Sequence, residues 1–181
     1  MIMSESRPSF YDLDQAALTE LAASLGWPAY RATQLHEWQM KGAVSFDVMN
    51  NLSKTMRTEL AERLNAAPLE LLMLETSQDD DTRKALFRLS DGHMIETVVM
   101  RYGDHRSVCV SSQVGCAMGC RFCASTGAGL ARNLTDGEML AQVLFMQREI
   151  GQKVTHVTVM GIGEPLQNLA ALILFIRRLA D

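Results

Sequence analysis

The sequence predicts a mixed α/β protein, in which a small helical amino-terminal domain is followed by a β-hairpin region and then by βα units. Apolar residues recur at helical spacing in the first part of the chain, whereas short runs typical of strands begin after Pro68. A strand, a helix and a second strand then follow between residues 107 and 160, which is the order of a βαβ unit with parallel strands. We therefore divide the chain into a helical domain, 1–66, and an α/β domain, 67–181.

The helical domain is predicted to contain three helices. Asp12 and Gln15 have the spacing of a capping box, so the first helix is expected to begin there. A second helix is expected over residues 29–39, and Ser53 is predicted to cap a third. Small helical domains often bind partners, so contact with RNA is one hypothesis for this domain and simple scaffolding is the other.

The α/β domain is expected to start with three short strands, and Asp91-Gly92 predicts a tight hairpin between the last two. The predicted strands are 69–75, 83–89 and 94–100. A βαβ unit follows, in which Thr135 and Glu138 form a second capping box at the start of the helix. Its expected elements are the strand 107–111, a loop to about 133, the helix 138–150 and the strand 154–160, with a further helix at 169–180.

The composition is that of a globular protein, with 48% hydrophobic and 21% charged residues. No apolar stretch approaches the length of a membrane span and no signal sequence is evident, so we expect a cytoplasmic protein without membrane contact. The formal net charge of -4 excludes the global basic excess that many nucleic-acid-binding proteins carry. A local basic patch and an ordinary solvated surface are both compatible with the charge pattern.

Three of the four cysteines lie close together, at Cys116, Cys120 and Cys123. Closely spaced thiols in a reducing compartment indicate metal or redox chemistry rather than a disulfide framework. Three thiolates on a cubic iron–sulfur cluster would leave one iron open to a ligand from outside the protein. The alternatives are a disulfide pair and a zinc site, for which Cys109 or His105 would supply the fourth ligand.

A glycine-rich turn, Gly161-Ile-Gly-Glu-Pro165, follows the second strand of the βαβ unit. It is not a dinucleotide fingerprint, because Leu166 occupies the position of the third glycine. Ligands of α/β proteins bind at the carboxyl edge of parallel strands. Gly163 is therefore expected to let a ligand approach closely, and Glu164 is expected to receive its ammonium group.

Three further residues are candidates for a functional role. Glu96 lies in an otherwise apolar row of a strand, and it is either a partly desolvated general base or a strand-edge charge that reaches water. Phe122 would offer an aromatic face beside the open iron, or would simply pack against the protein. Cys109 is the remaining cysteine, and a buried free cysteine usually serves as a small hydrophobic residue.

The cysteine spacing together with Phe122 resembles the cluster loop of radical S-adenosylmethionine enzymes. The turn from Gly161 to Pro165 is similar to the segment with which those enzymes contact the methionine amine. The run Cys109-Val-Ser-Ser-Gln-Val-Gly-Cys116 narrows the resemblance to the RlmN/Cfr family of RNA methyltransferases. Earlier segments that are similar to the same family are Pro28–Trp38, Asn51–Lys54 and Thr82–Lys84.

The resemblance implies a partial (βα)6 barrel and assigns roles to the candidate residues. Those it assigns to a [4Fe-4S] cluster and to S-adenosylmethionine are Cys116, Cys120, Cys123, Gly163 and Glu164. It also implies that Glu96 accepts a proton and that Cys109 is one of two cysteines that form a disulfide when product is released. The expected activity is methylation of adenine carbon 2 in 23S ribosomal RNA and transfer RNA, with a reductant such as flavodoxin. A radical reaction suits this carbon because it is electron-poor and carries no acidic proton.

The sequence departs from the family in one respect. The family's methyl-carrying cysteine lies in its carboxyl-terminal region, whereas no cysteine follows Cys123 here, and only about two βα units can be counted. We therefore expect a truncated form that does not complete methylation by itself. The alternatives are a relative that methylates carbon 8 of the same adenine and a non-catalytic iron–sulfur or RNA-binding remnant.

Overall fold

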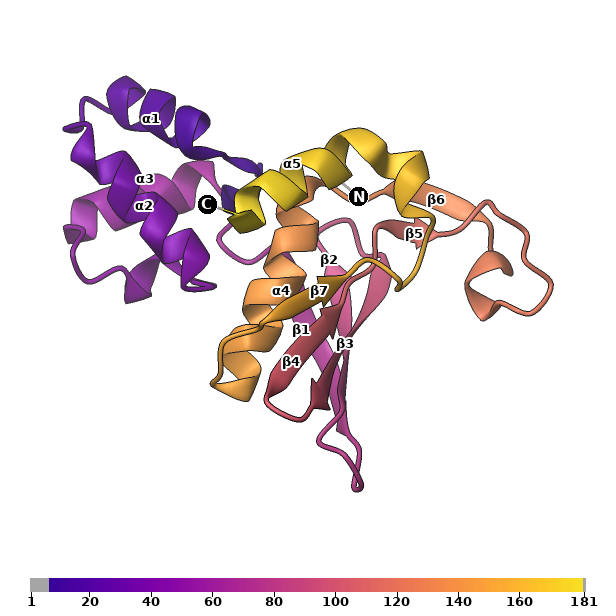
Figure 1. Cartoon of the computed structure of the whole chain (residues 1–181). Helices are drawn as coiled ribbons and strands as arrows, with labels where there is room; N and C mark the ends of the chain where they lie inside the picture. Colours follow the sequence, from indigo (N-terminus) through magenta and orange to yellow (C-terminus); the bar gives the residue numbers. More distant parts are fainter. Residues whose placement is uncertain (1–6, 181) are drawn as a thin grey trace. The chain divides into compact units, whose positions relative to one another are not determined.

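The computed structural model describes residues 7–180, and the chain divides into two compact units at Pro68. The first unit is helical, and the second combines a sheet with two long helices (Figure 1). The mixed α/β class with a helical amino-terminal part is therefore confirmed. No helix in the described part of the chain is long and apolar enough to cross a membrane.

Between residues 7 and 68, the part of the helical unit that the structure describes, there are three α-helices and two short 3-10 helices. They are η1 (Phe10–Asp12), α1 (Gln15–Ser24), α2 (Tyr30–Met40), η2 (Phe46–Val48) and α3 (Lys54–Arg63). Its core is built around Phe10, whose ring meets the ring of Phe46 edge to face at 5.4 Å between centroids. The buried side chain of Gln39 donates to the backbone carbonyl oxygens of Phe10 and Leu13, which ties α2 to the start of the chain.

The caps of this unit agree with the prediction at one helix and differ at another. Ser53 caps α3 by accepting a hydrogen bond from the backbone N–H of Met56 at 3.2 Å, as predicted. The predicted capping box at Asp12 is wrong, because Asp14 caps α1 and accepts from Ala17 N–H at 2.8 Å. Asp12 belongs instead to the preceding 3-10 helix, so the cap of α1 lies two residues later in the chain.

The α/β unit is built on a five-stranded sheet with the order β1-β2-β3-β4-β7. The strands are β1 (Leu69–Thr76), β2 (Arg83–Leu89), β3 (Met94–Tyr102), β4 (His105–Cys109) and β7 (His156–Thr158). The first four strands pair antiparallel, and the predicted hairpin at Asp91-Gly92 joins β2 to β3. β4 and β7 pair parallel, with Cys109 opposite Thr158. The predicted βαβ unit is therefore confirmed.

Helix α4 (Asp136–Ile150) connects the two parallel strands and packs against the sheet (Figure 1). Its capping box is present as predicted: Thr135 accepts from the backbone of Glu138, and Glu138 accepts from the backbone of Thr135, both at 3.0 Å. On the covered face of the sheet, the rings of Phe87 and Phe145 meet edge to face at 4.8 Å. The other face of the sheet is left half-exposed along β3.

The last segments of the described chain are η4 (Pro165–Asn168) and α5 (Leu169–Ala180). α5 packs against α4, and Arg178 forms a partly buried ion pair with Asp136 at 2.7 Å. β7 is shorter than the predicted strand 154–160 because its pairing with β4 ends at Thr158, after which the backbone turns toward Val110.

Two short strands, β5 (Gln113–Gly115) and β6 (Leu130–Asn133), form a separate antiparallel pair that was not predicted. They enclose the three-cysteine loop. Gly115 has a φ of +74°, and a Cβ at this position would lie 1.9 Å from the carbonyl oxygen of Gly129. The pair was missed because three or four residues show no usable periodicity, and partners far apart in the sequence define these strands.

Candidate functional site

The candidate site lies at the carboxyl edge of the two parallel strands. β4 ends at Cys109 and leads into the cysteine loop, and β7 ends at Thr158 and leads into the glycine-rich turn. Because parallel strands share one carboxyl edge, the loop and the turn start from the same edge of the sheet. The loop and the turn are both attached to the short segment, residues 110–112, that joins β4 to β5.

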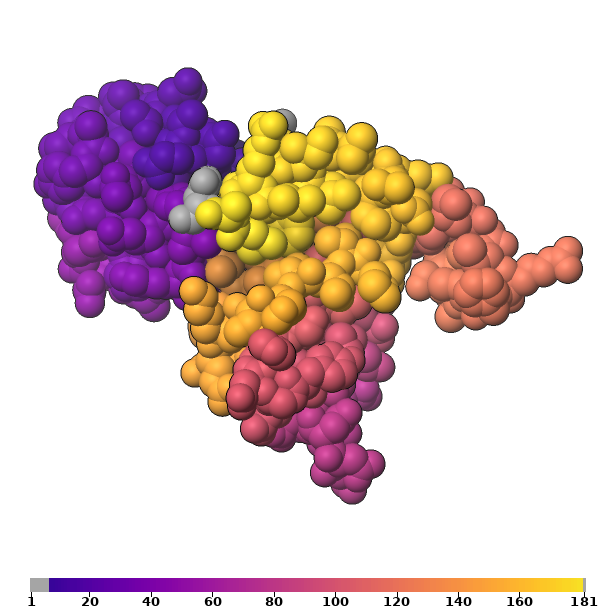
Figure 2. All heavy atoms as spheres, in the orientation of Figure 1, coloured from indigo at the N-terminus to yellow at the C-terminus, as the bar shows by residue number. Residues whose placement is uncertain are grey.

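The cysteine loop is closed at its base and exposed along its length. The backbone N–H of Cys116 donates to Gly129 O at 3.1 Å, which closes the base beside β5 and β6. Within the loop, Cys123 N–H donates to Cys120 O at 3.1 Å. Figure 2 shows the loop standing out from the rest of the α/β unit. Phe122 is 94% exposed, so its ring is not packed against the protein.

All four cysteines of the described chain are free thiols, and only Cys116 is buried. Thiolates are the ligands of iron–sulfur clusters, so three of them on one loop suit such a group. Within residues 7–180, however, no group of three or more His, Cys, Asp or Glu side chains is close enough to hold a metal ion. A cluster bound by Cys116, Cys120 and Cys123 therefore requires the loop to draw the three sulfur atoms together.

The glycine-rich turn packs tightly against the segment after β4. Gly163 has a φ of +104°, and a Cβ on it would lie 2.5 Å from Cβ of Gln113. A Cβ on Gly161 would lie 2.8 Å from Val110 O. The sequence suggested that these glycines admit a ligand, but the structure shows an additional reason for them. They let two backbone segments of the protein approach each other.

Glu164 lies at the end of this turn and is half-buried. Its carboxylate accepts a hydrogen bond from Leu166 N–H at 3.2 Å and so caps η4. Its own backbone N–H donates to Gln113 Oε1 at 2.8 Å. The Glu164 carboxylate therefore lies at the carboxyl edge of the parallel strands, on a backbone held by a hydrogen bond. A contact with a ligand cation would need such a position.

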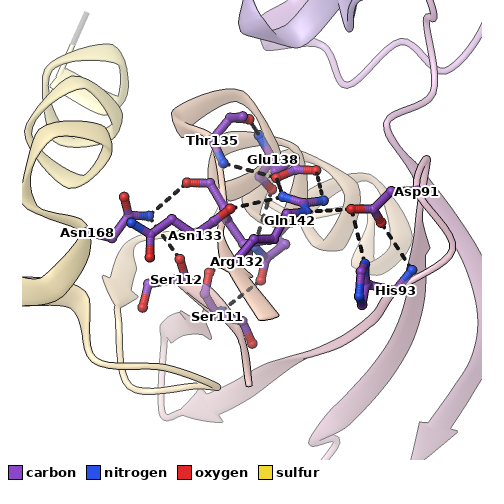
Figure 3. Close-up of polar contacts among 11 residues, drawn as sticks. Asp91, His93, Ser111, Ser112, Arg132, Asn133, Thr135, Glu138, Gln142 and Asn168 are labelled. Carbon is purple, nitrogen blue, oxygen red and sulfur yellow. Dashed lines mark hydrogen bonds and ion pairs between the residues drawn. The ribbon is translucent and has the colours of Figure 1, made fainter. Parts of the chain in front are cut away.

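Sequence reasoning missed a buried polar network that joins these segments (Figure 3). The side chain of Gln142, which is fully buried on α4, accepts from Ser111 N–H at 2.8 Å and donates to Ser111 O at 3.1 Å. The Ser111 hydroxyl donates to Glu96 O at 2.7 Å and accepts from Ile162 N–H at 3.1 Å. Polar residues at buried positions of a strand end and of an apolar helix were the signal that could have revealed this network.

The same segment is tied to the end of the glycine-rich turn by Asn168. Its amide donates to Ser112 O at 3.0 Å and to Leu134 O at 2.8 Å. The hydroxyl of Ser112 is buried and has no hydrogen-bond partner among the described residues. Buried hydroxyl groups are normally paired, so Ser112 is an exception among the described residues.

Arg132 on β6 anchors the strand that leaves the cysteine loop (Figure 3). Its guanidinium forms two hydrogen bonds of 2.8 Å with Glu138 and also contacts Asp91 in the β2–β3 turn. Glu138 and Asp91 raise the pKa of Arg132. Burial acts to raise the pKa of Asp91, but its hydrogen bonds with Arg132 and His93 outweigh that effect and lower the pKa from 3.8 to about 2.

Glu96 and Cys109 lie on the face of the sheet opposite α4. Cys109 pairs with Val98, two residues from Glu96, so all three project from that face. The Glu96 side chain is 46% exposed and lies 3.5 Å from Lys84 Nζ. Glu75 and Glu96 raise the pKa of Lys84. The sequence left open a partly desolvated base and a strand-edge charge, and in the structure the Glu96 carboxylate is half-exposed beside a cation.

Comparison with known proteins finds relatives that match both units of the chain. Residues 9–65 match the family described as Ribosomal RNA large subunit methyltransferase N-terminal domain. Two curated relatives carry the name "Probable dual-specificity RNA methyltransferase RlmN". The protein from Desulforamulus reducens is 45% identical over 169 residues, which are 93% of this chain and 48% of the relative. The protein from Symbiobacterium thermophilum is 46% identical over 170 residues, which are 91% of this chain and 45% of the relative.

A solved structure agrees with these sequence matches. The crystal structure of a radical SAM methyltransferase from Sphaerobacter thermophilus superimposes with a TM-score of 0.90 at 47% identity. The match covers 96% of this chain and 52% of the solved chain. The chain thus spans about half the length of the curated relatives and of the solved structure that it matches. By sequence and by fold, this chain is similar to the amino-terminal part of RlmN proteins and to about half of a radical S-adenosylmethionine methyltransferase.

Proposed function

We propose that this chain provides the cluster-binding and S-adenosylmethionine-binding part of an enzyme that methylates adenine carbon 2 in 23S ribosomal RNA and transfer RNA. One observation supports this proposal: the cysteine loop and the glycine-rich turn are attached to the same stretch of chain. Ser111, in the connection after β4, and Gln113, at the start of β5, both bond to the glycine-rich turn, and β5 leads directly into the cysteine loop. The names of the relatives support RNA as the substrate.

The proposed roles follow from where each residue lies. Cys116, Cys120 and Cys123 would hold a [4Fe-4S] cluster, because three thiolates satisfy three irons and leave the fourth for a ligand. Together with S-adenosylmethionine, the cluster supplies the one-electron chemistry needed at a carbon without an acidic proton. Gly163 and Glu164 would position the methionine part, the carboxylate receiving its ammonium group. An electron donor such as flavodoxin would reduce the cluster.

Two residues on the open face of the sheet would act on the RNA base. Glu96 would accept the ring proton, and its half-exposed position leaves the carboxylate accessible to a base. Cys109 would take part in the thiol chemistry that releases product. The remaining three cysteines are the proposed ligands, so no cysteine is left to carry the methyl group. We therefore propose that the isolated chain cleaves S-adenosylmethionine but does not methylate RNA.

Anaerobic reconstitution with iron and sulfide tests the ligand assignment. Reconstituted chain should contain about four irons, as one cubic cluster requires. Cys120→Ala should lose most of the iron, whereas the matched control Cys109→Ala should keep it, because Cys109 lies outside the loop. Iron retained in Cys120→Ala, or zinc bound in preference to iron, would contradict the proposed cluster.

Reduction of the reconstituted chain in the presence of S-adenosylmethionine tests the chemistry. We expect 5′-deoxyadenosine and no methylated RNA. The second candidate is a non-catalytic iron–sulfur or RNA-binding protein, which is favoured because none of the four cysteines is left to carry a methyl group. That candidate yields no deoxyadenosine. For the complete enzyme, mass spectrometry of the modified adenine would distinguish methylation at carbon 2 from methylation at carbon 8.

A further inference from the structure

The side chain of Gln113 connects the glycine-rich turn to the strand that leaves the cysteine loop. Its Oε1 accepts from Glu164 N–H at 2.8 Å, and its Nε2 donates to Asn133 Oδ1 at 2.7 Å. Gln113 is fully buried, whereas Asn133 is exposed. The oxygen and the nitrogen of one buried amide therefore form hydrogen bonds with two segments that are far apart in the sequence.

The backbone of Gln113 reinforces this connection. Its N–H donates to Ile162 O at 3.2 Å, and in the β5–β6 pair it lies directly opposite Asn133. Gly163 packs so closely against Gln113 that a Cβ on the glycine would overlap the glutamine side chain. The side chain consequently has little room to adopt another rotamer without moving the turn.

The contacts of the Gln113 side chain matter because Gln113 lies just before the cysteine loop. Cys116 follows three residues later, so Gln113 belongs to the strand that enters the cysteine loop, and Asn133 belongs to the strand that leaves it. One side chain thus holds both ends of the loop at a set distance from the Glu164 backbone. Hydrogen bonds in such a buried network restrict geometry more strongly than exposed ones.

We propose that Gln113 is a positioning residue, which holds the Gly163-Glu164 turn in register with the cysteine loop so that S-adenosylmethionine can span the two. The inference rests on the proposed function, because it takes Glu164 as the contact for the methionine ammonium group. Gln113 itself need not touch the ligand. Its effect is exerted through the Glu164 backbone and through Asn133.

The substitution Gln113→Met tests this role, because methionine has a similar length and volume and makes neither hydrogen bond. S-adenosylmethionine is titrated into the reconstituted chain with its cluster left oxidised, so that the ligand binds without being cleaved, and binding is measured by isothermal titration calorimetry. We expect the dissociation constant to rise on the order of tenfold, the effect of losing about one well-formed hydrogen bond. Iron content should stay at the wild-type value.

Two further variants serve as controls. Asn133→Ala, at an exposed position, frees only one end of the Gln113 amide and should weaken binding by about threefold. Near the carboxyl-terminal end of α4, Gln147 Oε1 accepts a hydrogen bond from Val154 N–H at 3.1 Å. Gln147→Met removes this comparable contact and should not change the affinity for S-adenosylmethionine.

Each outcome has a definite meaning. If the wild-type chain binds a cluster but no S-adenosylmethionine, the proposed function fails, and this inference fails with it. If wild type binds the ligand and Gln113→Met binds it equally well, only the inference is overturned. Parallel loss of iron and affinity in Gln113→Met would show a merely structural role. If that variant does not fold, unchanged affinity in Asn133→Ala refutes the inference on its own.

Discussion

At the residue scale, the glycine-rich turn shows how one position serves packing and function together. Gly163 combines a left-handed φ with a contact that leaves no space for a side chain, because Gln113 lies against it. Glycine would be needed here even without any ligand. A glycine-rich motif at a sheet edge is therefore not by itself proof that a ligand approaches that backbone.

The substitution Gly163→Ala should accordingly destabilise the chain, since it adds both backbone strain and overlap with Gln113. We expect a loss on the order of 3 kcal/mol in the free energy of unfolding, measured by chemical denaturation. Gly119→Ala is the matched control, because Gly119 also has a positive φ of +67° but no neighbouring atom within 4 Å of its Cβ position. Its loss should be about 1 kcal/mol, and equal losses in the two variants would show that packing against Gln113 is unimportant.

At the element scale, the strand that leaves the cysteine loop is anchored by charge. Arg132 on β6 joins the amino-terminal end of α4, through Glu138, to the β2–β3 turn, through Asp91. A two-stranded pair is only marginally stable alone. We infer that these ion pairs, with the Gln113–Asn133 hydrogen bond, keep β6 in place beside the larger sheet.

This anchor predicts a dependence of stability on pH. The pKa of Asp91 is lowered in the folded chain, so its ionised carboxylate stabilises the fold above pH 4, and that contribution is lost as the pH falls toward 2. Because Asp91 is 36% exposed, solvent screening limits the contribution to less than about 1 kcal/mol. Asp91→Asn should therefore lower the free energy of unfolding at pH 6 but have a smaller effect at pH 2.5.

Denaturant unfolding at both pH values provides the measurement for Asp91→Asn. Asp79→Asn, in the exposed β1–β2 turn, is the control for a general effect of removing a negative charge. A destabilisation of Asp91→Asn that is the same at both pH values would argue against an ionised Asp91 as part of the anchor.

At the scale of the whole molecule, α5 is buried on one side and exposes apolar side chains on the other. Leu172, Phe175 and Arg178 are buried on its inner side. Its outer side carries large apolar residues that are 42% to 54% exposed, namely Leu169, Ile173, Leu174 and Ile176. Contiguous apolar surface of this kind is uncommon on soluble monomers and promotes association.

We expect the chain to bind a hydrophobic dye and to self-associate as its concentration rises. Ile173→Glu together with Ile176→Glu should reduce both effects without loss of helix, because each side chain is about half exposed. Val48→Glu is the control, since Val48 is 49% exposed in the helical unit. Dye fluorescence and light scattering provide the measurements, and equal responses of the two variants would exclude α5 as the source.

Much of the fold was predictable because its signals are local. The capping box at Thr135, the cap at Ser53 and the hairpin at Asp91-Gly92 each involve residues within a few positions of one another. The misplaced first cap shows the limit of such signals. Asp12 and Asp14 are both plausible caps, and the short 3-10 helix decided between them.

The sequence by itself determined the order of the α-helices and of the strands of the larger sheet, the three-cysteine loop and the glycine-rich turn, because each depends on residue type and short spacing. Tertiary structure alone decided that Gln113 bridges Glu164 and Asn133 and that β5 and β6 pair across the loop. The physical reason is sequence distance. Gln113 lies twenty residues from one partner and 51 from the other, so no local pattern encodes contacts that only folding brings together.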